Sequence, residues 1–521
     1  MTFHAAFLWT LTLGPAVCMG LACLGATLGN PRIRTQWQIF ITASVSALLL
    51  ATLSLIAGPH TLPTDAVVQH TRIGLILAVL VQLLGTVIGV FSFRYLEGEP
   101  GQSKYIVALA GVLASVHILL MAQHWIVLIA AWSLTGIALH QLLCFYPDRP
   151  FARLAAHKKR LADRLADILL ILAASLAWST TGSGSFSSLE TYIATYGMSP
   201  SLQLSALALV LAVILRTALL PVHGWLTQVM EAPTPVSALL HAGVVNLGGF
   251  VLILFAPLLE DALAARALLV MTGLITAFLA GMVMLTRISI KVKLAWSTIA
   301  QMGFMLVECG LGLYTLAAVH LIGHSLYKAH AFLSASSVVH STRQAALRNT
   351  TEPYVASLIA APVASIVIVT TAVTTVDGTA WPWWWNGIIG FAWAPVLWQS
   401  KQATSWILQC ISTAFGVMAI IALTLAALLM HAVTLGLPAH PHDLLGYIAL
   451  AAMALLYISI LMIQLAPEKL AVWHRWSYAG FYMDEAYTRL ALKIWPTQWV
   501  PASTAPVHSP VSAPVLVQKT S

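Results

Sequence analysis

Long apolar runs follow one another along almost the whole chain, separated by short polar intervals. A helix needs roughly 20 apolar residues to cross about 30 Å of hydrocarbon, and many of the runs reach that length. The runs are continuous, whereas the strands of a transmembrane barrel alternate between apolar and polar residues. Because a helix also satisfies its backbone hydrogen bonds internally, the pattern predicts an all-α polytopic membrane protein.

The pattern predicts about fifteen helical segments, of which about 13–15 cross the membrane. The segment 383–400 is short and rich in Trp and Gly, and Thr180–Pro200 is the longest polar interval and is predicted to be a loop. The predicted segments cover residues 7–29, 37–58, 71–93, 104–121, 124–146, 162–181, 202–220, 235–258, 266–286, 291–310, 314–339, 353–376, 383–400, 405–433 and 444–466.

The composition excludes a water-soluble protein. Of the 521 residues, 59% are hydrophobic and 8% are charged, against about 25% charged residues in soluble domains. The net charge is +8, but the basic residues lie in short loops and no basic-aromatic module is present, which argues against nucleic-acid binding. The five cysteines contain no C-x-x-C pair, so we expect buried structural cysteines.

Lysine and arginine concentrate in alternate loops, and cytoplasmic loops of membrane proteins carry an excess of these residues. The opposite loops hold Arg72 near a helix start and Arg266 beside two acidic residues, and almost nothing else that is basic. The bias predicts an N-terminus outside and a cytoplasmic C-terminus. The enriched set is Arg32, Arg34, Arg94, Lys104, Arg149, Arg153, Lys158, Lys159, Arg160, Arg287, Arg343, Arg348, Lys401, Lys469 and Arg475.

One transmembrane domain is predicted over residues 1–475, with no soluble domain. The N-terminus lacks a basic region and an A-x-A cleavage site, so the first run is expected to be a retained helix and not a signal peptide. Residues 476–496 combine aromatic residues with two acidic and two basic ones, which predicts an amphipathic helix on the cytoplasmic face. Residues 497–521 are rich in Pro, Ser, Thr and Val and are predicted to be disordered.

Ionisable residues inside membrane spans are costly and are therefore functional candidates. Arg216 precedes Pro221 by five residues, and a proline frees backbone carbonyls, which is tolerated where helices break around a hydrated site. Pro233 and Pro235 can begin a helix because the first turn needs no N–H donor. His241 then lies about two helical turns inside the membrane.

Three further groups follow at helical spacing. His320, His324 and Lys328 are separated by four residues each, so they share one face of a helix. Imidazole accepts and donates protons near neutral pH, and desolvation lowers the pKa of a buried lysine in general. A chain of histidine, lysine and water on this face would form a proton wire.

Other ionisable groups lie in neighbouring segments. Lys291 and Lys293 begin the preceding helix, and Glu308 lies near its far end. Arg164 and Asp167, three residues apart, can pair on one helix face. The pair could equally be structural, and the two lysines could be cytoplasmic anchors. A histidine buried alone is often only structural.

A zinc site is the alternative for the histidine series, because H-x-x-x-H on a helix can bind zinc. However, Lys328 one turn further on would repel a cation, and we found no carboxylate within two turns on that helix. We therefore expect no metal, cofactor or catalytic residue in this chain.

The segment Arg216–Ala242 resembles the central motif of the antiporter-like subunits of respiratory complex I and Mrp cation antiporters, above all in Pro-Thr-Pro-Val-Ser-Ala-Leu-Leu-His-Ala. Residues 290–303 and the segment His320–Lys328 are also similar, and the resemblance extends over roughly 120–345. It implies two inverted five-helix repeats within about 104–433, each with a broken helix, and protons moving along a central hydrated axis.

By this resemblance Arg216 takes the place of the broken-helix lysine, and Lys401 is a candidate for the second one. Two departures stand out: Ser133 occupies the place of the family's membrane glutamate, and an arginine does not readily deprotonate. The pattern predicts no long lateral helix followed by a further span, as the largest complex I subunit has. The candidate ion-path residues are Arg164, Asp167, Arg216, Glu231, His241, Lys291, His320, His324, Lys328 and Lys401.

A diverged relative fits these departures, and the chain resembles the membrane subunits of the two-component DAB inorganic-carbon pumps. That resemblance implies a bacterial inner-membrane protein that conducts a cation, the proton being the first candidate. It also implies a peripheral cytoplasmic DabA-like zinc protein, similar to β-carbonic anhydrase, that converts CO2 to bicarbonate. Catalysis and zinc would belong to the partner. We assign its docking to the loops Asp148–Arg164 and Arg343–Glu352 and to Tyr478–Trp495.

Two alternatives remain. The chain could be a proton-translocating subunit of a complex I-like, hydrogenase-linked or Mrp-type complex, in which case iron–sulfur and quinone-linked subunits would accompany it. It could also be a scaffold that anchors a partner and conducts nothing, which Ser133 and Arg216 leave open.

Overall fold

The computed structural model describes residues 3–28, 32–59, 67–335, 354–376, 381–399, 401, 405–432, 437, 439–466, 468–497 and 499. Within them the regular structure is helical apart from two isolated β-bridges. Eleven of the described helical spans are long and apolar enough to cross a membrane, which confirms the all-α multi-pass prediction. The loop Arg343–Glu352 and, except for residues 497 and 499, the tail 497–521 lie outside the described residues.

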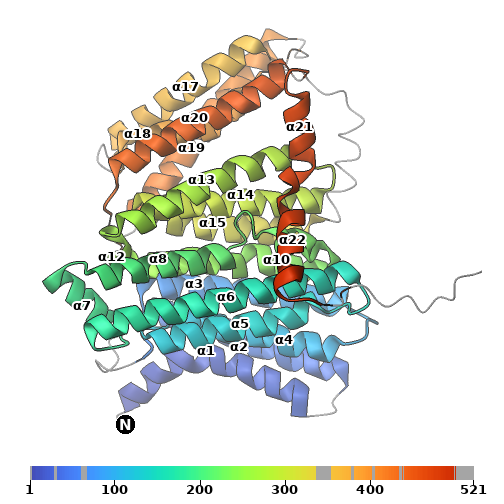
Figure 1. Cartoon of the computed structure of the whole chain (residues 1–521). Helices are drawn as coiled ribbons and strands as arrows, with labels where there is room; N and C mark the ends of the chain where they lie inside the picture. Colours follow the sequence, from blue (N-terminus) through green and yellow to red (C-terminus); the bar gives the residue numbers. More distant parts are fainter. Residues whose placement is uncertain are drawn as a thin grey trace, which may run out of the picture.

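The helices lie side by side in one elongated bundle that follows the order of the chain (Figure 1). One side holds α1 (Phe3–Leu28), α2 (Ile33–Ala57), α3 (Arg72–Tyr95), α4 (Gln102–Leu120) and α5 (Trp125–Leu143). The middle holds α6 (Pro150–Thr181), α8 (Pro200–Arg216), α9 (Gly224–Gln228), α10 (Thr234–Ala242), α11 (Leu247–Leu254), α13 (Leu263–Leu285), α14 (Ile290–Leu311) and α15 (Tyr314–Leu333). The other side holds α17 (Val355–Val376), α18 (Trp383–Trp393), α19 (Trp406–Ala432) and α20 (Asp443–Leu465).

Two short helices cross the ends of the long ones. Figure 1 shows α21 (Ala471–Tyr478) and α22 (Met483–Ile494) at the end of the bundle where α6 begins, which we name the α22 end. The helices α7 (Phe186–Tyr196) and α12 (Ala256–Glu260) lie at the opposite end. The predicted loop Thr180–Pro200 therefore contains a helix, α7, in which apolar residues occupy one face.

The sixth predicted helix was too short. We predicted it to begin at residue 162, but α6 begins at Pro150, because proline is favoured in a first turn. The charged run of residues 157–160 hid the helix from the apolar pattern, although Lys and Arg are good helix formers. The segment Asp148–Arg164 is thus mostly helix and not a loop, and its Lys158 and Lys159 are buried.

Two of the helical segments are broken, as predicted for the first of them. α8 ends at Arg216 and α9 begins only at Gly224, with Pro221 between them, because proline cannot donate a backbone N–H and favours a kink or break in a helix. The predicted helix 235–258 is interrupted at Gly243, which has φ −124° and ψ −69°. These breaks place polar side chains and free backbone groups in the middle of the bundle.

Candidate functional site

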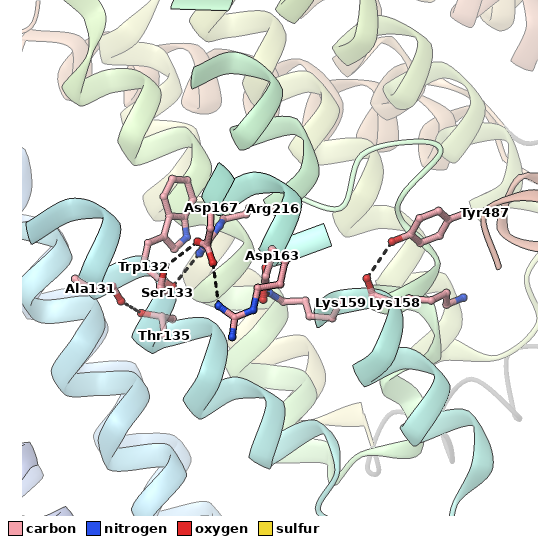
Figure 2. Close-up of polar contacts among 11 residues, drawn as sticks. Ala131, Trp132, Ser133, Thr135, Lys158, Lys159, Asp163, Asp167, Arg216 and Tyr487 are labelled. Atoms are coloured by element: carbon pink, nitrogen blue, oxygen red, sulfur yellow. Dashed lines mark hydrogen bonds and ion pairs between the residues drawn. The ribbon is translucent and has the colours of Figure 1, made fainter. Parts of the chain in front are cut away.

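A largely buried carboxylate on α6, Asp167, is the centre of the first group of ionisable residues. Asp167 forms an ion pair with Arg216 from the end of α8, and Ser133 Oγ on α5 donates to Asp167 Oδ1 at 2.7 Å. Arg216 also donates to the Trp132 carbonyl at 2.8 Å, with its guanidinium carbon 4.7 Å from the centre of the Trp132 ring. Arg164 lies 3.6 Å from Asp167 and is half exposed. Figure 2 shows these side chains converging from α5, α6 and α8.

The structure thus supplies a carboxylate where the sequence lacked one. Ser133 stands where the resemblance implies a glutamate, and its hydroxyl points at Asp167. The predicted Arg164–Asp167 pair exists, but the buried partner of Asp167 is Arg216, 49 residues away in sequence. An acidic group from α6 therefore faces the broken helix.

The same face of α6 continues toward the α22 end with groups that the sequence analysis missed. Lys159 Nζ lies 2.5 Å from Asp163 Oδ2, and both side chains are largely buried. Lys159, Asp163 and Asp167 have the i, i+4, i+8 spacing used above for α15, so that spacing was the available signal. It was overlooked because the start of α6 was assigned to a loop. We name Ser133, Lys159, Asp163, Asp167 and Arg216 the α6 cluster.

A polar cavity of about 180 Å³ lies beside the α6 cluster. Arg160 and Arg164 on its wall are exposed to solvent, so it reaches the surface of the described structure. A cavity of this size accommodates several water molecules. Its wall consists of Ser133, Gly136, Ile137, His140, Gln141, Lys159, Arg160, Asp163, Arg164 and Asp167.

Lys158, the residue before Lys159, is also buried, but its side chain contacts α22 and not Asp163. The Lys158 side chain is 0% exposed and its Nζ lies 2.7 Å from Asp484 Oδ1 on α22. The Tyr487 hydroxyl donates to the Lys158 carbonyl at 3.0 Å (Figure 2). Burial raises the pKa of Tyr487, so this hydroxyl stays protonated and remains a donor at neutral pH.

A second group of ionisable residues lies between α14 and α15. Lys328 is fully buried and donates to Ser297 Oγ at 2.7 Å and to the Leu294 carbonyl at 3.3 Å. About two turns earlier on α15, His320 Nδ1 lies 2.7 Å from Glu308 Oε2. We name this group, which also contains His324 and Gln301, the α15 cluster.

The α15 cluster bears on the expectation that no carboxylate lies near the histidine series. A carboxylate does approach the histidine series, because Glu308 comes from α14 and not from the histidines' own helix. The second ring nitrogen of His320 faces Gln301 Oε1 at 2.8 Å. Among the described residues, however, no group of three or more His, Cys, Asp or Glu side chains could hold a metal ion.

Three buried histidines, His223, His241 and the α15-cluster residue His324, have ring nitrogens without a hydrogen-bond partner among the described residues. Within the described part of the chain, no hydrogen-bond partner reaches either ring nitrogen of His241 or His324, or Nε2 of His223. The His241 ring stacks on Phe332 of α15 with centroids 4.4 Å apart. His223 lies at the end of the α8–α9 break, 4.8 Å from the ring of Trp296. Buried polar groups are almost always hydrogen-bonded, so these nitrogens single out the three rings as candidates for a functional role.

The remaining predicted residues lie farther out. Lys291 donates to Thr234 Oγ1 at 2.7 Å and is half-buried, which links the starts of α14 and α10. Glu231 lies 3.7 Å from Arg149, with both side chains well exposed. Lys401 is in an exposed turn. The structure therefore places seven of the ten predicted residues in the α6 cluster region or at α15, whereas Lys291, Glu231 and Lys401 lie outside these groups.

Comparison with known proteins gives a family match. Residues 122–416 match the family described as "NADH:quinone oxidoreductase/Mrp antiporter, TM". The probable inorganic carbon transporter subunit DabB of Hydrogenovibrio crunogenus is 36% identical over 449 residues, which cover 82% of this chain and 83% of that protein. The probable subunit DabB2 of Halothiobacillus neapolitanus is 43% identical over 326 residues, with 60% and 59% covered.

More distant similarities are to an NADH-quinone oxidoreductase subunit and to an Mrp complex. The NADH-quinone oxidoreductase subunit L of Mycobacterium tuberculosis is 30% identical over 286 residues, which span 45% of that protein. The structure of the Mrp complex from Dietzia sp. DQ12-45-1b superimposes with a TM-score of 0.60 at 20% sequence identity, covering 93% of this chain and 61% of that one. At this identity the structural match shows a shared fold.

Proposed function

The chain belongs to the NADH:quinone oxidoreductase/Mrp antiporter transmembrane family as a membrane subunit of the cation-transporter type, and from this premise we propose that it conducts protons for an inorganic-carbon transporter. The α15 cluster is the observation that carries the proton assignment. A lysine placed in the bilayer centre costs about 3 kcal/mol on insertion scales. Lys328 is nevertheless fully buried, and no ion pair within 4.0 Å accompanies it among the described residues.

Imidazole and ammonium groups suit proton transfer better than sodium binding. Sodium, a hard cation, is bound by oxygen ligands, as calcium and magnesium are. The buried centre instead offers His241, His324 and Lys328, with imidazole nitrogens that no described residue reaches with a hydrogen bond. Neutral imidazole accepts a proton on one nitrogen and donates from the other, so water between these rings would complete a relay.

The α6 cluster provides the second titratable stage of this proposed path. An arginine does not readily give up its proton, so in this proposal the carboxylates of Asp163 and Asp167, and not Arg216, carry the proton through the cluster. The polar cavity beside Asp167 and Asp163 would connect it to the α22 end. The positive-charge bias in the loops supports a cytoplasmic α22 end, with the N-terminus outside and the chain in a bacterial inner membrane.

We assign carbonic-anhydrase chemistry to a separate subunit. The similarity to subunits named as inorganic carbon transporter components supports a carbon substrate, and a peripheral DabA-like zinc protein would convert CO2 to bicarbonate while this chain supplies the driving ion. A complex I-like role is the second candidate, favoured by the similarity to NADH-quinone oxidoreductase subunit L.

Purification and flux measurement test the proposal together. We expect affinity-purified complex to contain a second protein with bound zinc, and vesicles containing it to take up protons when a membrane potential is imposed, without added Na+. Co-purifying iron–sulfur subunits would favour the complex I-like role. Vesicles that show no cation flux would instead leave an anchoring function, and flux that requires Na+ would refute the proton assignment.

A further inference from the structure

An unusual turn directly before α22 directs this helix toward the start of α6. Gly480, Phe481 and Tyr482 all have left-handed backbone conformations, with φ of 64°, 57° and 56°. Such angles are uncommon for bulky residues and persist where surrounding contacts hold them. Here the Phe481 ring packs 5.1 Å from that of Trp473, and the Tyr482 ring 5.8 Å from that of Trp476. α22 is therefore directed by packed aromatic rings and not by a free linker.

The helix α22 places the carboxylate of Asp484 against Lys158 and Gln228. Its Oδ1 accepts from Lys158 Nζ at 2.7 Å and its Oδ2 accepts from Gln228 Nε2 at 3.2 Å. Lys158 Nζ also donates to Thr488 Oγ1 at 3.1 Å, one turn further along α22. The carboxylate that compensates the buried Lys158 charge thus comes from a helix 326 residues away in sequence.

The contact between Asp484 and Lys158 also involves α9, the helix that follows the break. Gly224, the first residue of α9, lies so close that a Cβ added there would collide with the Asp484 carboxylate and approach Lys158 Nζ to 2.8 Å. The next residue, Trp225, has its ring centre 5.0 Å from Lys159 Nζ. The start of α9 is therefore enclosed between two lysines, one held by α22 and the other by Asp163 in the α6 cluster.

We propose that Asp484 is a positioning residue of the ion path, and that α22 gates the path by holding Lys158 away from the α6 cluster. This inference rests on the proposed cation conduction. With α22 docked, Lys158 is paired with Asp484 and Lys159 stays paired with Asp163. When α22 moves, Lys158 loses its counter-charge, and a buried charge without a partner forces its surroundings to rearrange. Both the first turns of α6 and the start of α9 then shift, which changes access to Asp163 and Asp167.

The test compares the complex containing the full-length chain with variants of both partners in proton-flux vesicles. Asp484→Asn alone could prevent folding, because it leaves Lys158 buried and unpaired. The variant Lys158→Met/Asp484→Asn removes both charges and keeps the volumes. We expect it to fold with unchanged thermal stability but to change flux by about tenfold, a typical size for coupling between sites. Glu485→Gln, one residue along on the exposed face of α22, is the matched control and should keep wild-type flux.

Each outcome decides between roles. Wild-type flux in the folded double variant would overturn the gating proposal, and so would loss of the folded protein, because the pair would then be a structural clamp. Unequal flux between Glu485→Gln and the wild type would point to surface charge in place of the Asp484 contact, and would also overturn it. A wild-type complex that conducts no cation would refute the proposed function itself, which separates that failure from a failure of the gate.

Discussion

The ion pair between Asp167 and Arg216 predicts that removing one member costs more stability than removing the other. Changing Asp167 to Asn removes the charge that compensates Arg216, whose side chain is 3% exposed. Besides Asp167, Arg216 has a hydrogen bond to the Trp132 carbonyl, while its Nε has no partner among the described residues. Leaving one member of a buried pair alone costs about 3–5 kcal/mol, so we expect Asp167→Asn to lose about that much stability.

The opposite change should cost less. In Arg216→Met, Asp167 keeps the hydrogen bond from Ser133 and the ion pair with Arg164 at 3.6 Å. Arg164 is 55% exposed, and exposed pairs contribute at most about 1 kcal/mol. Together with a charged hydrogen bond worth about 1.5–3 kcal/mol, this retains part of the compensation. The double variant removes both charges and should lie within about 1 kcal/mol of the wild type, since apolar replacements of buried pairs are often neutral.

Thermal unfolding in detergent can measure this cycle through a native thiol. Cys309 is fully buried, whereas Cys18, Cys23, Cys144 and Cys410 are more accessible. In a background with these four changed to serine, a thiol-reactive dye labels Cys309 only when the bundle opens. The melting temperature should fall most for Asp167→Asn, less for Arg216→Met and least for the double variant. A larger loss for Arg216→Met, or losses that add in the double variant, would show that Asp167 is not the counter-charge of Arg216.

Three further predictions use other parts of the structure. Lys328→Met should stop proton flux in vesicles while leaving the complex folded, whereas His330→Gln on the exposed face of the same helix should not; full flux in Lys328→Met would refute the α15 relay. Gly224→Ala should release α22 and expose it to limited proteolysis, because the new Cβ meets the Asp484 contact, whereas Gly281→Ala, with no atom within 4 Å of its added Cβ, should leave α22 protected. A cytoplasmic reporter fused after Arg475 should be active, and an inactive one would reverse the proposed orientation.

Much of the fold follows from local pattern. Run length and continuity alone predicted the multi-pass helical bundle, because the bilayer sets both the length and the composition of a span. The break after Arg216 followed from Pro221, because a proline beyond the first turn removes a helical hydrogen bond and kinks or breaks the helix. The shared face of His320, His324 and Lys328 followed from helical periodicity, which holds before any packing is known.

What the sequence by itself left open is which charges are buried and with what partner. The run at 157–160 has the composition of an exposed loop, yet Lys158 and Lys159 are buried. Burying a charge is costly unless a counter-charge meets it, and for Lys158 that group is Asp484, which is distant in sequence and lies on α22. Likewise Ser133 looked like the loss of an acid until α6 placed Asp167 against it. Helical periodicity acts within one segment, but charge compensation acts between segments, so only the tertiary structure could decide it.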